Sequence, residues 1–264
     1  MANRHYDTHM DWYTPVPVSA HLHSHVVCAW TAQIQRWHSI TPDGCVDVVW
    51  TSAGDVRVCG PETSGWSIRL PEGTRAVGVR LRPGVAHSLF SVNMGELRDR
   101  RVELADLVGP ACAADIRARV EDAPFGRERA LRMVESVTRL LDDSRERDDW
   151  LARTISTSLA RRSWDIAQLA HDASLTTRQL HRRSVHAFGY GASTLRAVLR
   201  LQRFMSLARS NSRHQLVDLA YLAGFSDQAH LIRESHRFSG LTPSALLASE
   251  APGWHGNGTP WWDH

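Results

Sequence analysis

The sequence contains no lysine, no long hydrophobic run and no closely spaced pair of cysteines. All 31 basic residues among the 264 are arginine. Arginine suits contacts with phosphate groups and guanine bases. A GC-rich genome produces the same bias, however, so arginine usage over the whole chain does not by itself indicate a function.

These absences exclude several classes of protein. No stretch approaches the ~20 apolar residues that span a bilayer, and residues 1–20 lack the apolar run of a signal peptide. There is no Gly-rich phosphate loop and no Gly-x-Ser-x-Gly element. We therefore expect a cytoplasmic protein with no membrane partner, no cofactor and no enzyme activity. Four cysteines without CxxC spacing are expected to be free thiols: Cys28, Cys45, Cys59 and Cys112.

Charge is distributed unevenly along the chain. Residues 1–151 hold 18 arginines and 21 acids, whereas residues 152–250 hold 13 arginines and 6 acids. A net charge of −3 in front is thus followed by +7 behind, with one further acid in the tail. This asymmetry suggests that the back half binds a polyanion.

The front half has the pattern of a β-rich domain, and the back half has helical periodicity. Short apolar or alternating runs at 26–30, 45–50, 56–58 and 76–81 are separated by turn signals, which fits a small sheet or barrel. Spacings near 3.6 over 112–121 and 127–142 predict helices. The charged stretch from Asp142 to Asp149 reads as a hinge or as a solvated helix end.

The predicted fold class is α+β, with a β-rich, cupin-like domain and an all-helical domain. We expect four segments: a sensor domain at 1–108, a helical connector and candidate dimerisation element at 109–151, a DNA-binding domain at 152–250 and a tail at 251–264. Trp261 and Trp262 could pack this tail onto the body or onto a second subunit.

The back half contains a diverged internal repeat. One copy runs from Asp165 to Arg183 and the other from Gln215 to Arg233. Their Leu-Ala pairs are 50 residues apart and their later Leu and Arg positions are 51 apart, so one residue is inserted within the second turn. Each copy reads as a short helix, a turn and a second helix with a polar start.

Each second helix of the repeat has a cap signal and an exposed polar face. Ser174 or Thr176 is expected to cap the first, and Ser226 or Asp227 the other. Leu180 and Leu231 are expected to point inward. The outward positions are Arg178, His181 and Arg182 in the first copy, and Gln228, Ala229, His230 and Arg233 in the second.

Such a face could be the ordinary surface of a helical bundle. Two copies in one register on a basic background favour DNA, because arginine and glutamine match the base edges of the major groove. Residues 194–209 between the copies read as one helix, about 24 Å long at 1.5 Å per residue. A rod of this size could place two reading helices about one DNA turn, ~34 Å, apart.

The back half resembles the AraC/XylS family of bacterial transcription regulators. The resemblance covers residues 152–248 and is most specific from Ala223 to Pro243. The matching elements are Ile166-Ala167-x-Leu169-Ala170, Leu180-x-Arg182-Arg183, Phe188-Gly189-Tyr190-Gly191, a long helix with Arg196, Arg200, Leu201 and Arg203, Leu219-Ala220-x-x-Ala223-Gly224-Phe225-Ser226-Asp227-Gln228-x-His230-Leu231-x-Arg233, and Gly240-Leu241-Thr242-Pro243.

The resemblance implies seven helices, with reading helices near 176–186 and 227–237. The family usually has Phe or Tyr where Ser184 and Ser235 stand, and Phe188 and Phe238 are expected to fill that space, with Val185 as an alternative to Phe188. The DNA-binding residues it implies are Thr177, Arg178, His181, Arg182, Arg183, Gln228, Ala229, His230, Arg233 and Arg237.

The front half resembles the sensor domains of some actinobacterial members of the family. The matching segments are Leu22-His23-Ser24-His25-Val26 with Trp30, Pro42 to Trp50, Gly60 to Thr63, and Gly78 to Gly84. A signal received there would control the rear domain. The candidate ligand-binding residues are Trp30, Trp50, Arg80, Arg82 and His87, and Trp66 is a further candidate for the cavity wall. Alternatively, the tryptophans are plain core and the arginines pair with Asp47 or Glu62.

Other functions remain as alternatives. His21, His23 and His25 alternate, so on a strand they would share a face and could bind a metal, as in a metal-dependent cupin-type enzyme fused to a DNA-binding module. No second ligand at cupin spacing is evident, so we predict no metal site. A repair protein would need a Pro-Cys-His-Arg element, which is absent. A nucleoid-type binder without sequence preference is a further alternative. The expected partners are double-stranded DNA and, as candidates, a small-molecule effector, RNA polymerase and a second copy of the chain.

Overall fold

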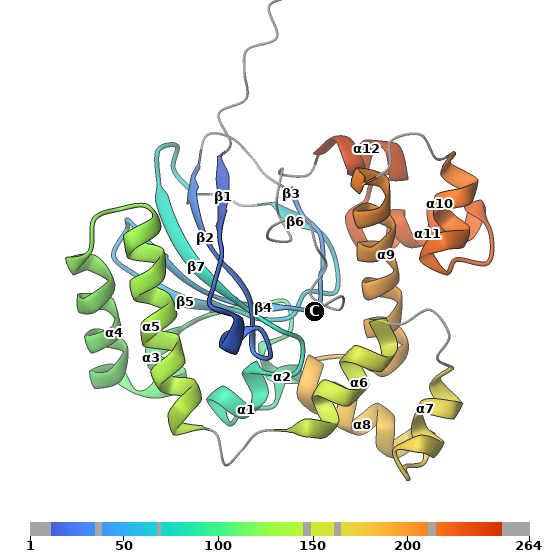
Figure 1. The fold of residues 1–264 in the computed structure, drawn as a ribbon, viewed down its shortest axis with the longest axis horizontal. Helices are drawn as coiled ribbons and strands as arrows, with labels where there is room; N and C mark the ends of the chain where they lie inside the picture. The colour runs from blue at the N-terminus through green and yellow to red at the C-terminus, as the bar shows by residue number, and fades with distance from the viewer. Residues whose placement is uncertain are drawn as a thin grey trace, which may run out of the picture.

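The computed structural model describes residues 12–34, 39–67, 70–144, 149–160, 165–210 and 215–249. The predicted tail, with Trp261 and Trp262, lies outside these residues, as does part of the charged stretch after Asp142. The front half is a sheet backed by helices, and the back half is a group of helices on the other side of that sheet (Figure 1). The predicted α+β fold class, with a β-rich front and a helical back, is confirmed.

The front half is built on a six-stranded antiparallel sheet in the order β1-β2-β7-β4-β5-β8, beside a two-stranded sheet of β3 and β6. The strands are β1 (Tyr13–Val16), β2 (Val26–Gln33), β3 (Ser39–Ile40), β4 (Val46–Thr51), β5 (Val56–Cys59), β6 (Trp66–Ser67), β7 (Arg75–Leu81) and β8 (Arg101–Glu103). Valine-rich alternation specifies them, because successive side chains point to opposite faces.

Helices cover one face of the sheet. They are α1 (Ala86–Phe90), α2 (Met94–Leu97), α3 (Leu104–Val108), α4 (Pro110–Asp122) and α5 (Arg127–Asp143). Helix α5 packs on β1, β2 and β7. Its Met133 and Val137 share one buried core with Val48 and Val79 of the strands. Burying one such side chain contributes about 1.5–3 kcal/mol, so the helices expected as a connector are part of the core that holds the sheet.

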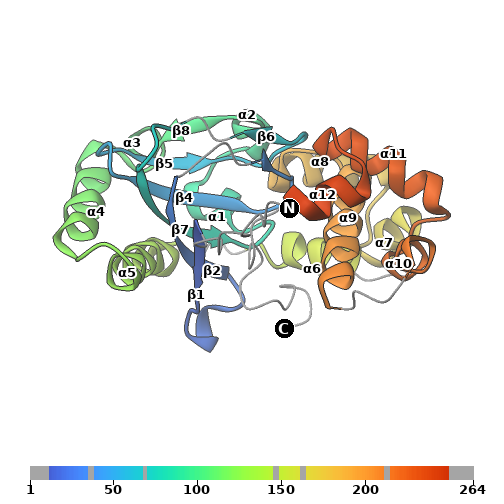
Figure 2. The same cartoon turned by 90° about the horizontal axis from the view of Figure 1, so that it is seen from above.

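In its described residues, the back half consists of seven helices. They are α6 (Trp150–Ala160), α7 (Ile166–Asp172), α8 (Thr177–Phe188), α9 (Ala192–Ser210), α10 (Leu216–Ala223), α11 (Gln228–Ser239) and α12 (Pro243–Ser249). Helix α9 runs from the group α6–α8 to the group α10–α12 (Figures 1 and 2). Leu195 and Leu199 of α9 belong to the first core, whereas Leu201 and Phe204 belong to the second.

One expectation about local structure turned out differently. The residues around His21 and His23 form a 3-10 turn, Ala20–Leu22, and not a strand with three histidines on one face. The turn forms because the amide groups of Leu22 and His23 donate to the carbonyls of Ser19 and Ala20.

Among the helices in the described part of the chain, none has both the length and the apolar character that crossing a bilayer requires.

Candidate nucleic-acid interface and ligand cavity

The two repeats fold as two helix-turn-helix units. In the first, the Leu175 amide donates to the Ala170 carbonyl at 2.8 Å, and in the second the Phe225 amide donates to the Ala220 carbonyl at 2.9 Å. Both first helices therefore end in the same way, 50 residues apart. The caps that follow, Thr176 and Asp227, are 51 residues apart. The inserted residue is thus Ser226, within the second turn.

The second helix of each unit begins at a well-formed cap. Thr176 accepts from the Gln179 amide at 3.2 Å while the Gln179 side chain accepts from the Thr176 amide, which is a capping box. Asp227 accepts from the His230 amide at 2.6 Å. This hydrogen bond, with one from the Ser226 hydroxyl, lowers the pKa of Asp227. The caps are therefore Thr176, not Ser174, and Asp227, not Ser226.

The predicted reading face of α8 is open to solvent. Thr177, Arg178, His181, Arg182 and Arg183 are all exposed, while the opposite face is buried in the domain. The three arginines have no ion-pair partner among the described residues, which leaves their guanidinium groups available to an incoming anion.

The matching face of α11 is also accessible. Gln228, Ala229, Arg233 and Arg237 are exposed, and His230 is half-buried. The His230 ring meets Phe225 edge-on at 5.3 Å, and its Nδ1 lies 3.0 Å from the Ser226 hydroxyl. His230 is therefore held in place by the turn, and Arg237 pairs with Glu234 at 3.4 Å on the same helix.

Two serines occupy positions where the family that the chain resembles usually has Phe or Tyr. Ser184 and Ser235 are fully buried, and Phe188 and Phe238 are buried at the ends of the same helices. The Ser235 hydroxyl donates to the Leu241 carbonyl at 2.8 Å. The expectation that the phenylalanines fill the space agrees with these positions.

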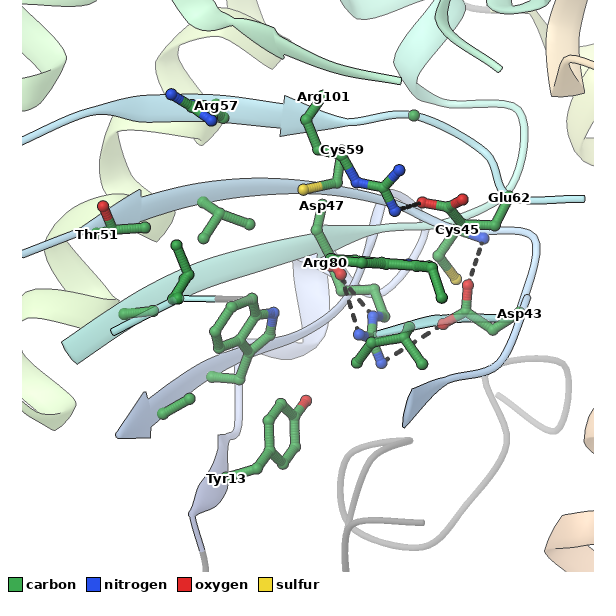
Figure 3. A pocket seen from close by; sticks show the side chains of 18 of the residues that line it. Tyr13, Asp43, Cys45, Asp47, Thr51, Arg57, Cys59, Glu62, Arg80 and Arg101 are labelled. Atoms are coloured by element: carbon green, nitrogen blue, oxygen red, sulfur yellow. Dashed lines mark hydrogen bonds and ion pairs between the residues drawn. The ribbon is translucent and has the colours of Figure 1, made fainter. Parts of the chain in front are cut away.

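A cavity of about 260 Å³ opens on the sheet face opposite α4 and α5. Trp30 and Arg80 of the predicted ligand residues line it, as does Trp66. Alternation along the strands explains which residues line the cavity: Asp47, Cys59 and Arg80 face away from the covering helices (Figure 3). Trp30 lines the same cavity from β2.

The other three predicted ligand residues lie elsewhere. Trp50 points to the helix-covered face, where its Nε1 donates to Glu121 at 3.1 Å. Arg82 follows β7 and is half-buried. His87 is buried on α1, with its Nε2 3.1 Å from an Asp149 oxygen. This hydrogen bond lowers the pKa of Asp149 to about 2.

Arg80 crosses the floor of the cavity between two acids. Its Nε and Nη2 donate to the two oxygens of Asp47 at 3.1 and 3.0 Å, and its Nη1 lies 3.5 Å from Asp43 (Figure 3). Register causes the first pairing, since Asp47 and Arg80 are cross-strand partners. Burial raises the pKa of Asp43, and Arg80 opposes that increase.

A second ion pair closes one end of the cavity. Arg101 of β8 donates to Glu62 and stacks over the Trp66 ring, 3.7 Å from its centre. Burial raises the pKa of Glu62 to about 8, against the influence of Arg101. Sequence reasoning missed Tyr13, Asp43 and Arg101 as cavity residues. A charged residue inside a valine-rich strand, such as Asp47, was the available signal.

The loop beside the cavity also contacts the helical half. The Pro42 carbonyl accepts from the buried Gln202 Nε2 of α9 at 2.7 Å. A Cβ atom on Gly44 would lie 3.2 Å from Leu195 Cδ1, so this backbone lies against α9. Cys45 belongs to the core of the first helix-turn-helix unit. Asp43, in the middle of this loop, faces the cavity.

Metal binding by the histidines finds no support in the geometry. Within the described ranges, no three His, Cys, Asp or Glu side chains converge as a metal site. The His23 ring lies 3.2 Å from the Val18 carbonyl. The four cysteines are free.

Comparison with known families gives two matches. Residues 169–249 match a family described as a helix-turn-helix domain. The C-terminal domain is an AraC-type helix-turn-helix domain. Residues 14–103 match a domain of unknown function, DUF6597, which fits a sensor domain in front of the helix-turn-helix domain. The protein is accordingly a DNA-binding transcription regulator.

No curated protein matches the chain. Among solved structures, ToxT from Vibrio cholerae is similar, with 12% identity and a TM-score of 0.47 over 85% of this chain and 98% of that one. ToxT from the same species with a bound unsaturated fatty acid shows 13% identity and a TM-score of 0.45 over 84% of this chain and 94% of that one. ToxT with bound (E)-4-(8-methylnaphthalen-1-yl)but-3-enoic acid shows 13% identity and a TM-score of 0.45 over 90% of this chain and 98% of that one.

Proposed function

We propose that the regulator reads DNA through the exposed faces of α8 and α11, placed in successive major grooves by α9. The main support is that both faces point to solvent with their arginines exposed. They stay exposed although α1 and α2 of the front half pack against α8. At 1.5 Å per residue, α9 is about 28 Å long, close to the ~34 Å of one DNA turn. Contacts with phosphates give affinity, and contacts with base edges give specificity.

Substitution of the reading arginines tests this proposal. After bound sequences are selected from a random pool, the affinity for the selected site is measured by fluorescence anisotropy. Arg178→Ala and Arg233→Ala should each weaken specific binding by about 1–3 kcal/mol, which is roughly 5- to 150-fold. Arg132→Ala, on the exposed side of α5, is the matched control and should leave binding unchanged.

Two outcomes would contradict the proposal. An unchanged affinity of both reading variants for the selected site would exclude these faces as the contact surface. Equal affinity of the wild-type protein for selected and random DNA at moderate salt would favour the nucleoid-type alternative instead.

We also propose that the front half is an effector-binding unit that includes α4 and α5 and ends at the segment between α5 and α6. Support for the extent comes from the common core of these helices with the sheet. Support for the role comes from the cavity, which has apolar walls and a few fixed polar groups, as ligand sites usually have. A second copy of the chain and RNA polymerase stay predicted partners.

The loop from Thr41 to Cys45 is the proposed route from the cavity to the DNA-binding half. Asp43 faces the cavity, while Pro42 and Gly44 on either side of it contact α9. A ligand that displaces Asp43 moves the backbone on which α9 rests. The effect on DNA binding equals the difference in the ligand's affinity for the two arrangements.

Gln202→Met tests the route. Methionine keeps the volume but removes the hydrogen bond to the Pro42 carbonyl, so DNA binding without ligand should persist while the ligand-induced change in DNA affinity shrinks. The exposed Gln168→Met in α7 is the matched control and should keep the full change. An undiminished ligand effect in the Gln202 variant would exclude this hydrogen bond from the route.

A further inference from the structure

The hydrogen-bonding groups of the cavity are unevenly satisfied. Its arginines are all engaged: Arg80 with Asp43 and Asp47, Arg101 with Glu62, and Arg57 with Asp55. The same contacts occupy the acids, and Asp43 also accepts from the Cys45 amide at 2.8 Å. Each charge on the cavity wall therefore already has a partner of opposite sign.

The groups without a partner are all N–H donors. The indole Nε1 atoms of Trp30 and Trp66 and the Nε of Arg101 are buried and have no hydrogen-bond partner among the described residues. All three side chains line the cavity, and Trp30 is only 7% exposed. Indole and guanidinium nitrogens can donate but cannot accept. A buried donor without an acceptor is unfavourable because its lost hydrogen bonds to water are not replaced, so a ligand that presents acceptors is stabilised here.

The walls around these donors are flat and apolar. The Trp30 indole lies directly over Gly78, where any Cβ atom would overlap its ring. The Tyr13 and Trp30 rings are 5.7 Å apart and tilted by 34°. Ile34, Ile40 and Val49 complete an aliphatic and aromatic lining that favours a planar body.

We propose, on the basis of the effector-binding function above, that the ligand is an uncharged aromatic molecule whose carbonyl-type oxygens accept from Trp30, Trp66 and Arg101. Four acids and three arginines line the cavity. An added anion therefore meets more negative than positive charge and finds no arginine that lacks an acid. An added ammonium group brings further donors to a wall that already has donors in excess.

The test compares four head groups on one aromatic body. Acetylnaphthalene carries a neutral acceptor, naphthoate an anion, naphthylmethylamine a cation and ethylnaphthalene no polar group. The matching single-ring set is acetophenone, benzoate, benzylamine and ethylbenzene. Binding to the full-length protein without DNA is measured by isothermal titration calorimetry. The ketone should bind most tightly in at least one set, about 2- to 10-fold better than the alkyl compound, as expected for one hydrogen bond.

Phenylalanine variants assign the donors. Trp30→Phe and Trp66→Phe each remove one N–H and keep an aromatic ring, so each should lower the affinity for the ketone by about 2- to 10-fold. Neither should change the affinity for the alkyl compound. Trp150→Phe is the matched control, since Trp150 is 66% exposed on α6 and lies outside the cavity.

The outcomes separate this proposal from the one on which it rests. Tighter binding of the carboxylate or the amine, or no binding of any compound at millimolar concentration, overturns the ligand class and leaves DNA recognition intact. Conversely, ketone binding that leaves the affinity for DNA unchanged would sustain the ligand class and overturn the proposed effector-binding role.

Discussion

Replacing Arg80 by methionine should be the most damaging single change in the cavity. Arg80 is 1% exposed, and its guanidinium donates twice to Asp47 and faces Asp43. Methionine occupies a similar volume along the side chain but carries no charge. The variant therefore keeps two acids beneath the cavity and loses the cation that lies between them.

The expected loss follows from the burial of this group. Removing one partner of a buried ion pair typically costs about 3–5 kcal/mol, because the remaining charge is left uncompensated. A loss of about 4 kcal/mol lowers the ratio of folded to unfolded protein nearly a thousandfold. Neutralising the acids as well, with Asp43→Asn and Asp47→Asn in the same chain, should recover most of that loss.

Urea unfolding followed by circular dichroism measures the effect. The matched control is Arg132→Met, which breaks an exposed pair with Glu135 and should cost at most about 1 kcal/mol. Without Arg80, only the hydrogen bonding with Cys45 opposes the burial that raises the pKa of Asp43, so the folded variant binds a proton more readily than the unfolded chain does. The stability that the variant loses relative to the wild type should therefore shrink as pH falls from 8 to 5. A deficit near 1 kcal/mol that does not depend on pH would refute the reasoning.

Four further changes have defined outcomes. Thr176→Ala removes the cap of α8 and should lower stability by about 1 kcal/mol in urea unfolding, with no loss expected for Thr177→Ala one residue on. Phe238→Ala should cost about 3–5 kcal/mol by the same assay, and a loss below 1 kcal/mol would mean that this ring is not the core of the second unit. Gly44→Ala should cost about 1–2 kcal/mol, because its φ of +82° disfavours a side chain; full stability would show that the loop relaxes. The pKa of Glu62 is raised from 4.5 to about 8 in the folded chain, so wild-type stability should fall as pH rises from about 5 to 8. Glu62→Gln should remove this pH-dependent contribution to stability. If the variant keeps the pH profile of the wild type, the raised pKa of Glu62 is contradicted.

The helical half was predictable because its signals are local. Caps, apolar spacing and the Leu-Ala pairs lie within a few residues of the elements that they specify, so the helix-turn-helix repeat and the position of its insertion could be read directly. The predicted long helix at 194–209 lies within Ala192–Ser210. The faces of α8 and α11 followed from helical periodicity alone.

The cavity was only partly predictable because it depends on which face of the sheet is covered. Trp30 and Trp50 both stand in apolar strands, yet their positions relative to the covering helices differ, so one lines the cavity and the other packs under α4. Alternation groups side chains by face but does not say which face receives α5. Arg101 lies at the cavity because β8 pairs with β5, and this long-range pairing has no local signal in the sequence.

The sharing of α9 between two cores also has a consequence for the genome. A continuous helix resists both stretching and twisting, so under the proposed mode of DNA recognition the two half-sites of an operator must keep one separation and one relative orientation. Inserting five base pairs between them should abolish binding by turning one half-site to the far side of the duplex. Inserting ten restores the orientation but leaves the second half-site out of reach, so true operators should show no variation in spacer length.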